Sequence, residues 1–146
     1  IPDFLSLTQA IENSRLNQTL NTPALTTLLL MESQLEWMMS LGGLTPAAEH
    51  CTQASGLLYD WAESREDVTP FVAEPSHRSR VVVTLDLADG IDASRVTSVL
   101  RANGIVDTEP YRKLGRNQIR VATFVGVPLG DVEKLIASLD FVLDNL

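Results

Sequence analysis

The chain has little cysteine, little histidine and no long apolar run, and each shortage excludes a class of protein. The single cysteine, Cys51, can form neither an internal disulfide nor a thiolate metal site, so we predict a small buried residue in a reducing, cytoplasmic setting. His50 and His77 stand in no metal-binding spacing. Apolar runs such as residues 28–31 are far shorter than the roughly 18 to 20 residues that cross a membrane. We therefore expect no metal centre and no membrane span.

Basic residues are also scarce, because 11 Lys and Arg face 19 Asp and Glu, which gives a formal net charge of −8. Nucleic acids and anionic membranes are bound mainly by neutralising phosphates with Lys and Arg, so neither is an expected partner. The composition is typical of a globular domain, since 146 residues, of which 45% are hydrophobic, are enough to bury a core.

The first part of the sequence has the spacing and punctuation of helices. A short amphipathic helix is predicted over residues 7–17 and a long helix over residues 23–41. Thr22 is the predicted N-cap of the long helix, and Pro23 is its first residue, where a missing N–H costs nothing. Gly42-Gly43 is the predicted stop.

A second Thr-Pro pair follows, in which Thr45 is the predicted cap and Pro46 the first residue of a second long helix that runs to residue 66. Residues 68–79 hold two prolines and no helical period, which predicts a loop or hinge. Residues 80–87 are rich in β-branched and apolar side chains, which predicts a well-buried strand.

The last third alternates between helices and extended pieces. Asp92 caps a predicted helix that Gly104 ends, and residues 105–110 are a predicted short extended piece. Residues 117–124 alternate as a strand, and a final helix is predicted over residues 129–143. This order favours an α+β fold: two long N-terminal helices, then a small, mainly antiparallel sheet covered by helices. We divide the chain into a helical segment, 1–66, and a small α/β domain, 67–146.

A third of the basic residues crowd into EPYRKLGRNQIR, residues 109–120, which contains Arg112, Lys113, Arg116 and Arg120. Arg120 lies in the middle of the predicted strand, and its neighbours Ala122 and Phe124 on the same face are not polar. We therefore expect its guanidinium to point toward a partly covered surface and to need an anionic partner. A guanidinium matches carboxylate or phosphate with a planar fork. The alternative interpretation of the cluster is a solvated loop with one edge-strand arginine.

The tripeptide Asn21-Thr22-Pro23 also has two interpretations, which are compatible. The first is the helix cap described above. The second is an anion site, because a helix N-terminus presents free N–H groups, to which the Asn amide and the Thr hydroxyl add neutral donors.

The stretches PDFLSL, NTP and RANGIVDTEPYRKLGRNQIRVATF together resemble the C-terminal part of phosphoserine aminotransferases of the actinobacterial type, and the resemblance covers nearly the whole chain. It implies part of a fold-type-I, pyridoxal-phosphate-dependent homodimer in the cytoplasm. That enzyme converts 3-phosphohydroxypyruvate and glutamate to O-phosphoserine and 2-oxoglutarate in serine biosynthesis. The free-standing alternative is an anion-binding or regulatory domain, whose gene would encode no large domain ahead of Ile1.

The resemblance also implies which parts of the enzyme lie elsewhere. In the family, a large domain supplies the lysine that binds pyridoxal 5'-phosphate covalently, and neither Lys113 nor Lys134 matches it. We therefore expect no catalytic residue in this chain, no cofactor bound by it alone and no activity of the chain alone. Helices without their large domain would expose apolar surface, so we expect non-native self-association or a swapped dimer.

Five residues match the family's binding positions. Asn21 and Thr22 match the Asn-Thr pair that reaches the cofactor phosphate of the other subunit, and Arg120 matches the arginine that takes the substrate α-carboxylate. Tyr111 and Arg112 match a His-Arg pair that helps hold the distal phosphate or carboxylate. Here the tyrosine replaces the usual histidine, and the spacing to Arg120 is two residues longer.

Overall fold

The computed structural model describes residues 2–146. The chain divides into two compact units, and the boundary between them falls between Leu41 and Gly42. The first unit holds the short 3-10 helix η1 (Asp3–Leu5) and the helices α1 (Leu7–Arg15) and α2 (Leu25–Ser40). Ser6 caps α1 by accepting a hydrogen bond from the Gln9 N–H. None of these helices contains a buried residue.

The long helix α2 begins later than predicted, so the assignment of Thr22 as its N-cap is wrong. The N-cap is Ala24, which makes no side-chain capping bond, and its carbonyl accepts the first intrahelical bond, from the Leu28 N–H at 3.0 Å. A residue before proline is pushed out of the helical region, which keeps Thr22 outside the helix. The donors of Thr22 and Asn21 are therefore not used by α2.

The predicted stop at Gly42-Gly43 is confirmed, because both glycines have positive φ, 102° and 79°. A Cβ added to Gly42 would lie 2.9 Å from Cγ of Pro46, so a side chain there would clash as well as strain the backbone. Gly43, not Thr45, is the N-cap of the next helix, and Pro46 lies inside the first turn, where its missing N–H is still harmless.

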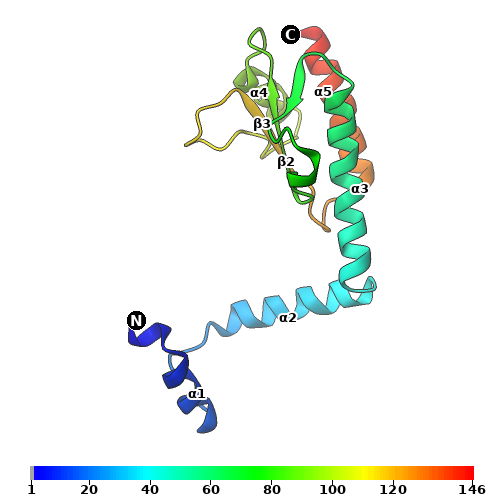
Figure 1. Ribbon diagram of the computed structural model, residues 1–146. Helices are drawn as coiled ribbons and strands as arrows, with labels where there is room; N and C mark the ends of the chain where they lie inside the picture. The colour runs from blue at the N-terminus through cyan, green and yellow to red at the C-terminus, as the bar shows by residue number, and fades with distance from the viewer. Residues whose placement is uncertain (1) are drawn as a thin grey trace. The chain divides into compact units, whose positions relative to one another are not determined.

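The second unit contains the remaining elements in an α+β order, as Figure 1 shows. They are α3 (Leu44–Glu63), β1 (Val68–Pro70), the 3-10 helix η2 (Pro75–His77), β2 (Val82–Leu87), α4 (Ala93–Ala102), β3 (Gln118–Ala122) and α5 (Leu129–Asn145). Two predicted helix ends are confirmed here. Asp92 caps α4 by accepting a hydrogen bond from the Ser94 N–H, and Gly104 follows α4 with φ 84°.

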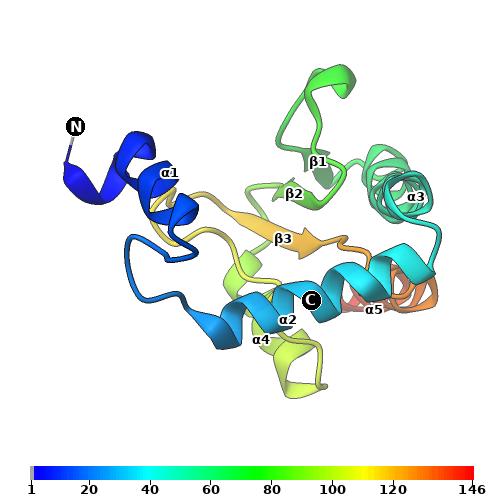
Figure 2. The ribbon, with the colours of Figure 1, turned by 90° about the horizontal axis from the view of Figure 1, so that it is seen from below.

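The sheet is antiparallel with the order β1-β2-β3, and Figure 2 shows β2 between its neighbours. β1 lies inside residues 68–79, so the prediction of a loop there is wrong for its first three residues. Pro70 is tolerated because β1 is an edge strand. Residues 105–110 form no strand, and the Thr108 carbonyl accepts one bond beside β3, from the Arg120 N–H at 3.0 Å.

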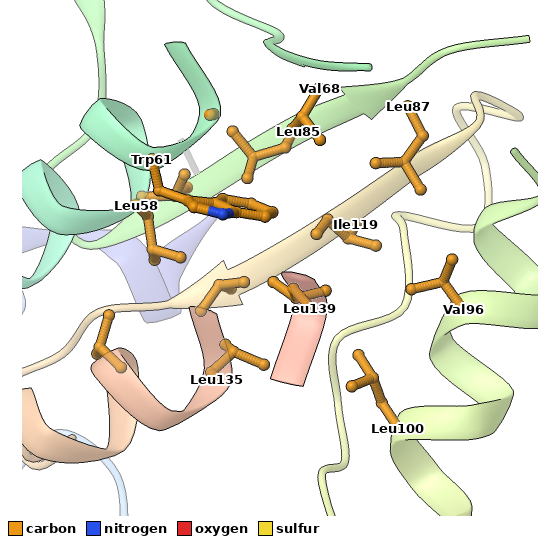
Figure 3. Packing of buried hydrophobic residues seen from close by; sticks show 14 of the residues in the cluster. Leu58, Trp61, Val68, Leu85, Leu87, Val96, Leu100, Ile119, Leu135 and Leu139 are labelled. Atoms are coloured by element: carbon orange, nitrogen blue, oxygen red, sulfur yellow. The ribbon is translucent and has the colours of Figure 1, made fainter. Parts of the chain in front are cut away.

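The core lies between one face of the sheet and the helices of the second unit. Every second residue of β2 is buried, and Val132, Leu135, Leu139 and Val142 form the buried stripe of α5. In Figure 3, Leu58 and Trp61 of α3 point toward Leu85 of β2 and Ile119 of β3. Burial of such side chains is the main stabilising contribution to a domain of this size.

Candidate anion-binding site

Strand β3 has one face in the core, while its other face is buried at Gln118 and exposed from Arg120 onward. Ile119 and Val121 are buried in the core, whereas Arg120 and Ala122 are exposed and Phe124, just beyond the strand, is 51% exposed. This confirms the predicted alternation. Arg120 itself is exposed, but its cross-strand partner Thr84 is half-buried and Gln118, on the same face, is 1% exposed, so the surface around Arg120 is partly covered, as predicted.

The two acidic residues that most closely precede Arg120 in sequence are paired with another arginine. Nη2 of Arg101 lies 2.7 Å from a carboxylate oxygen of Glu109 and 3.5 Å from one of Asp107. The hydrogen bond from Arg101 lowers the pKa of Glu109, so this carboxylate is fully charged and occupied at neutral pH. Within residues 2–146, the Arg120 guanidinium has no ion-pair partner.

The loop before β3 carries two further cations. Tyr111 is 56% exposed, and Arg112 and Lys113 are exposed beside it, without an ion pair to any described residue. The Leu114 N–H donates to the Tyr111 carbonyl at 3.0 Å, and Gly115 follows with φ 65°, a conformation that favours glycine. A tight turn therefore presents Arg112 and Lys113 to the surroundings.

Arg116 lies in the loop and its side chain is half exposed, but it differs from its neighbours because it has an ion-pair partner within the chain. Its Nε and Nη2 donate to the two carboxylate oxygens of Asp86 at 3.1 and 2.9 Å. Its guanidinium also lies over the Phe71 ring, 5.1 Å from the centroid. The hydrogen bonds with Asp86 raise the pKa of Arg116. Its charge is therefore compensated inside the chain, unlike those of Arg112 and Arg120.

Asn21 and Thr22 lie in the first unit and are exposed, in the segment between α1 and α2. Together with Ser14 and residues 17–20 they line a shallow hollow whose side chains are almost all polar. An amide and a hydroxyl that do not cap the helix remain donors for an anion. These neutral donors suit a phosphate group.

In the described part of the chain, the lysine and histidine side chains do not gather into a catalytic or metal-binding cluster. Lys134 is paired with Asp131 on α5 at 3.1 Å, and Nε2 of His50 lies 2.8 Å from the Val127 carbonyl oxygen. Among the described residues, no group of three or more His, Cys, Asp or Glu could hold a metal ion, and no helix is long and apolar enough to cross a membrane. Cys51 is buried in α3, as predicted.

Three residues that order the candidate site were missed by sequence reasoning. Asp86 and Arg101 are the partners described above, and Asn117 joins the end of the loop to the start of α4. Its Nδ2 donates to the Ile91 carbonyl at 2.7 Å, and its Oδ1 accepts from the Ala93 N–H at 2.9 Å. The register that pairs Asp86 with Gln118 is the signal that could have located Asp86.

Comparison with known proteins shows which proteins the chain is similar to. No family model matches the chain. Over 145 residues it is 53% identical to a phosphoserine aminotransferase of Corynebacterium glutamicum, and over 146 residues 55% identical to one of a Nocardioides species. The chain is homologous to phosphoserine aminotransferases. It spans 39% of the length of each of these relatives.

Solved phosphoserine aminotransferases have the same fold over this region. One from Bacillus circulans subsp. alkalophilus is 22% identical with a TM-score of 0.85, covering 97% of this chain and 38% of its own. Another, from Trichomonas vaginalis with PLP bound, is 16% identical with a TM-score of 0.80, covering 96% of this chain and 40% of its own. The predicted fold, that of the C-terminal small domain of these enzymes, is confirmed.

Proposed function

We propose that this chain is the C-terminal part of a phosphoserine aminotransferase that converts 3-phosphohydroxypyruvate and glutamate to O-phosphoserine and 2-oxoglutarate. The observation that carries the proposal is the 53% to 55% identity to such enzymes over essentially the whole chain. The homodimer and the cytoplasmic location belong to the same proposal. The division at residues 66 and 67 stays part of it only as the end of the two long helices, because the compact units divide between Leu41 and Gly42.

Arg120 and Arg112 are the proposed substrate ligands. Each of the four reactants carries an acidic group at both ends, so the enzyme needs two separate cationic contacts. Arg120 lies on a rigid strand and would take the α-carboxylate, while Arg112 would take the distal phosphate or carboxylate, with Tyr111 beside it. Both cations are free of ion pairs among residues 2–146. An unpaired guanidinium can meet a carboxylate or a phosphate with two parallel hydrogen bonds.

Asn21 and Thr22 are the proposed ligands of the cofactor phosphate, through the amide and hydroxyl donors that α2 leaves unused. Pyridoxal phosphate, when bound, supplies the electron sink for transamination. The remaining contacts with the cofactor, including the lysine, belong to the part of the relatives that this chain does not span. On this proposal the chain alone is inactive.

A hybrid enzyme tests the proposal directly. In it, the matching 145 residues of the Corynebacterium glutamicum relative are replaced by this chain. We expect the hybrid enzyme to form O-phosphoserine. Because one charge-assisted hydrogen bond contributes about 1.5 to 3 kcal/mol, Arg120→Ala should lower kcat/KM by roughly ten- to a hundredfold.

Arg95 provides the matched control, since it is an exposed arginine of α4 that has no ion-pair partner within the described residues. Arg95→Ala should leave kcat/KM unchanged. A folded hybrid enzyme without transaminase activity would contradict the proposed function. Equal kinetics for Arg120→Ala and the parent hybrid would remove Arg120 from the site.

A further inference from the structure

The loop that carries Arg112 is fastened at both of its ends. At the first end Arg101 holds Glu109, with a hydrogen bond of 2.8 Å from its Nε. At the second end Asn117 is bonded to the turn that leads into α4. The four residues from Tyr111 to Leu114 make no ion pair with the described part of the chain. Their position therefore depends on the anchors on either side.

Arg116 is the anchor nearest to the free cations. Arg116 donates two parallel hydrogen bonds of 3.1 and 2.9 Å to the Asp86 carboxylate. Nε2 of Gln118 donates to the same carboxylate at 2.8 Å. Gln118 is 1% exposed, so one member of this cluster is immobilised by packing. A two-point contact fixes the direction of the guanidinium as well as its distance.

The sheet explains why Asp86 can receive Arg116. Asp86 of β2 pairs with Gln118 of β3, so the residue two positions before Gln118 passes close to the Asp86 side chain. Phe71, which follows the edge strand β1, supplies the surface over which the Arg116 guanidinium lies. Arg116 thus connects the loop to β2, through Asp86, and to Phe71, which follows β1, on the face of the sheet that carries Arg120.

We propose that Arg116 is a positioning residue: its pairing with Asp86 holds the Tyr111 to Leu114 turn so that Arg112 can bind the far anionic group of the substrate whose carboxylate Arg120 holds. This inference rests on the proposed function. In this proposal Arg116 acts through Asp86, because its Nε and Nη2 donors are used by that carboxylate.

Removing either partner separates positioning from direct binding. If Arg116 acts through Asp86, Arg116→Gln and Asp86→Asn weaken the binding of phosphorylated substrate alike, and the double variant is no worse than either single one. If Arg116 were a ligand, Asp86→Asn would release its cation and would not weaken binding. Arg116→Lys keeps the positive charge but cannot make two parallel hydrogen bonds to Asp86. If Arg116 is a positioning residue, this variant should behave as Arg116→Gln does.

Kinetics of the hybrid enzyme give the first measurement. Both single variants should raise KM for 3-phosphohydroxypyruvate by about three- to fivefold with kcat within about twofold, because binding is lost equally in the ground and transition states. Arg95→Gln is the control and should change neither constant. An unchanged KM in Arg116→Gln, or a raised KM in Arg116→Gln with none in Asp86→Asn, would overturn the proposal.

Backbone ¹⁵N relaxation of residues 42–146, the unit that contains the core, gives the second measurement, which does not need activity. The amides of residues 111–115 should become more mobile on the picosecond to nanosecond timescale in Arg116→Gln and Asp86→Asn, but not in Arg95→Gln. Equal order in parent and variants would overturn the positioning role. If the parent hybrid enzyme is inactive but the variants still increase the mobility of the loop, the proposed function is contradicted. The role of the Arg116–Asp86 pair in ordering the loop would then still be supported.

Discussion

The two units of this chain use apolar residues in different ways. From Gly42 onward, apolar side chains gather in one core in which Leu58, Leu85 and Ile119 are completely buried. In the first unit, α1 and α2 contain no buried residue. A sequence can therefore specify a helix clearly without providing the surface that the helix needs.

Helix α2 shows the difference most clearly, because apolar residues occupy all of its sides. The large exposed ones include Leu28, Leu29, Leu30, Met31, Leu35, Trp37 and Met39. A helix that is apolar all round is usually buried in an intact protein. The relatives are far longer than this chain, which spans 39% of their length. We expect α2 to be covered by surface that its own unit does not supply.

Removing the first unit should produce the largest effect. Residues 42–146 alone should unfold in one cooperative transition and stay monomeric, because their core is complete. The whole chain should self-associate through the apolar surface of residues 2–41. Light scattering at increasing concentration checks this, and a whole chain that stays monomeric would contradict it.

The next comparison sets a buried leucine against an exposed one. Leu58→Ala should lower the free energy of unfolding by about 2 to 5 kcal/mol, because it removes a completely buried side chain and leaves a cavity. Leu30, which is 67% exposed in α2, is the matched control, and Leu30→Ala should change the value by less than about 0.5 kcal/mol. Urea unfolding measures both. Similar losses would mean that α2 contributes to the cooperative core.

A smaller effect is expected from the ion pairs that join α3, β1 and α5. Arg65 contacts Asp67, Asp140 and Asp144 at 2.8 to 2.9 Å, and its hydrogen bond lowers the pKa of Asp67. A lowered carboxyl pKa stabilises the fold above the unfolded value of about 3.9, and this contribution is lost as pH falls through the folded value. Arg65→Gln should cost about 1 to 2 kcal/mol at pH 7.

Urea unfolding of residues 42–146 at pH 7, 4 and 3 measures the pH dependence. The free energy of unfolding should fall below pH 4, and less steeply in Arg65→Gln, because that variant no longer holds Asp67 in its charged form. Parallel pH profiles for parent and variant would show that other carboxylates cause the loss.

The smallest effect on stability belongs to the proposed substrate ligand. Arg120 is exposed and unpaired within the described residues, so Arg120→Ala should change the free energy of unfolding by less than about 0.5 kcal/mol. The same change should lower activity strongly in the hybrid enzyme. A large loss of stability would mean that Arg120 supports the sheet, and it would weaken its assignment as a substrate ligand.

Much of the second unit could be predicted because its signals are local. Alternation placed Ile119 and Val121 in the core, Asp92 located the start of α4, and the spacing of apolar residues located the stripe of α5. The strand at Val68–Pro70 was missed, because three residues ending in proline carry no periodic pattern and become a strand only by pairing with β2. The cap of α2 was misplaced because Thr before Pro is also typical of an extended segment.

The sequence by itself determined the presence of the helices, the alternation of β3 and the concentration of positive charge in residues 109–120. Its long stretches of similarity also indicated the resemblance to phosphoserine aminotransferases. Only the tertiary structure decided which of those charges are free. Antiparallel pairing brings Asp86 to Arg116 from 30 positions away, while Arg101 of α4 takes Glu109, and Arg112 and Arg120 keep no partner among residues 2–146. Electrostatic compensation depends on distance in space, which the order of residues along the chain does not contain.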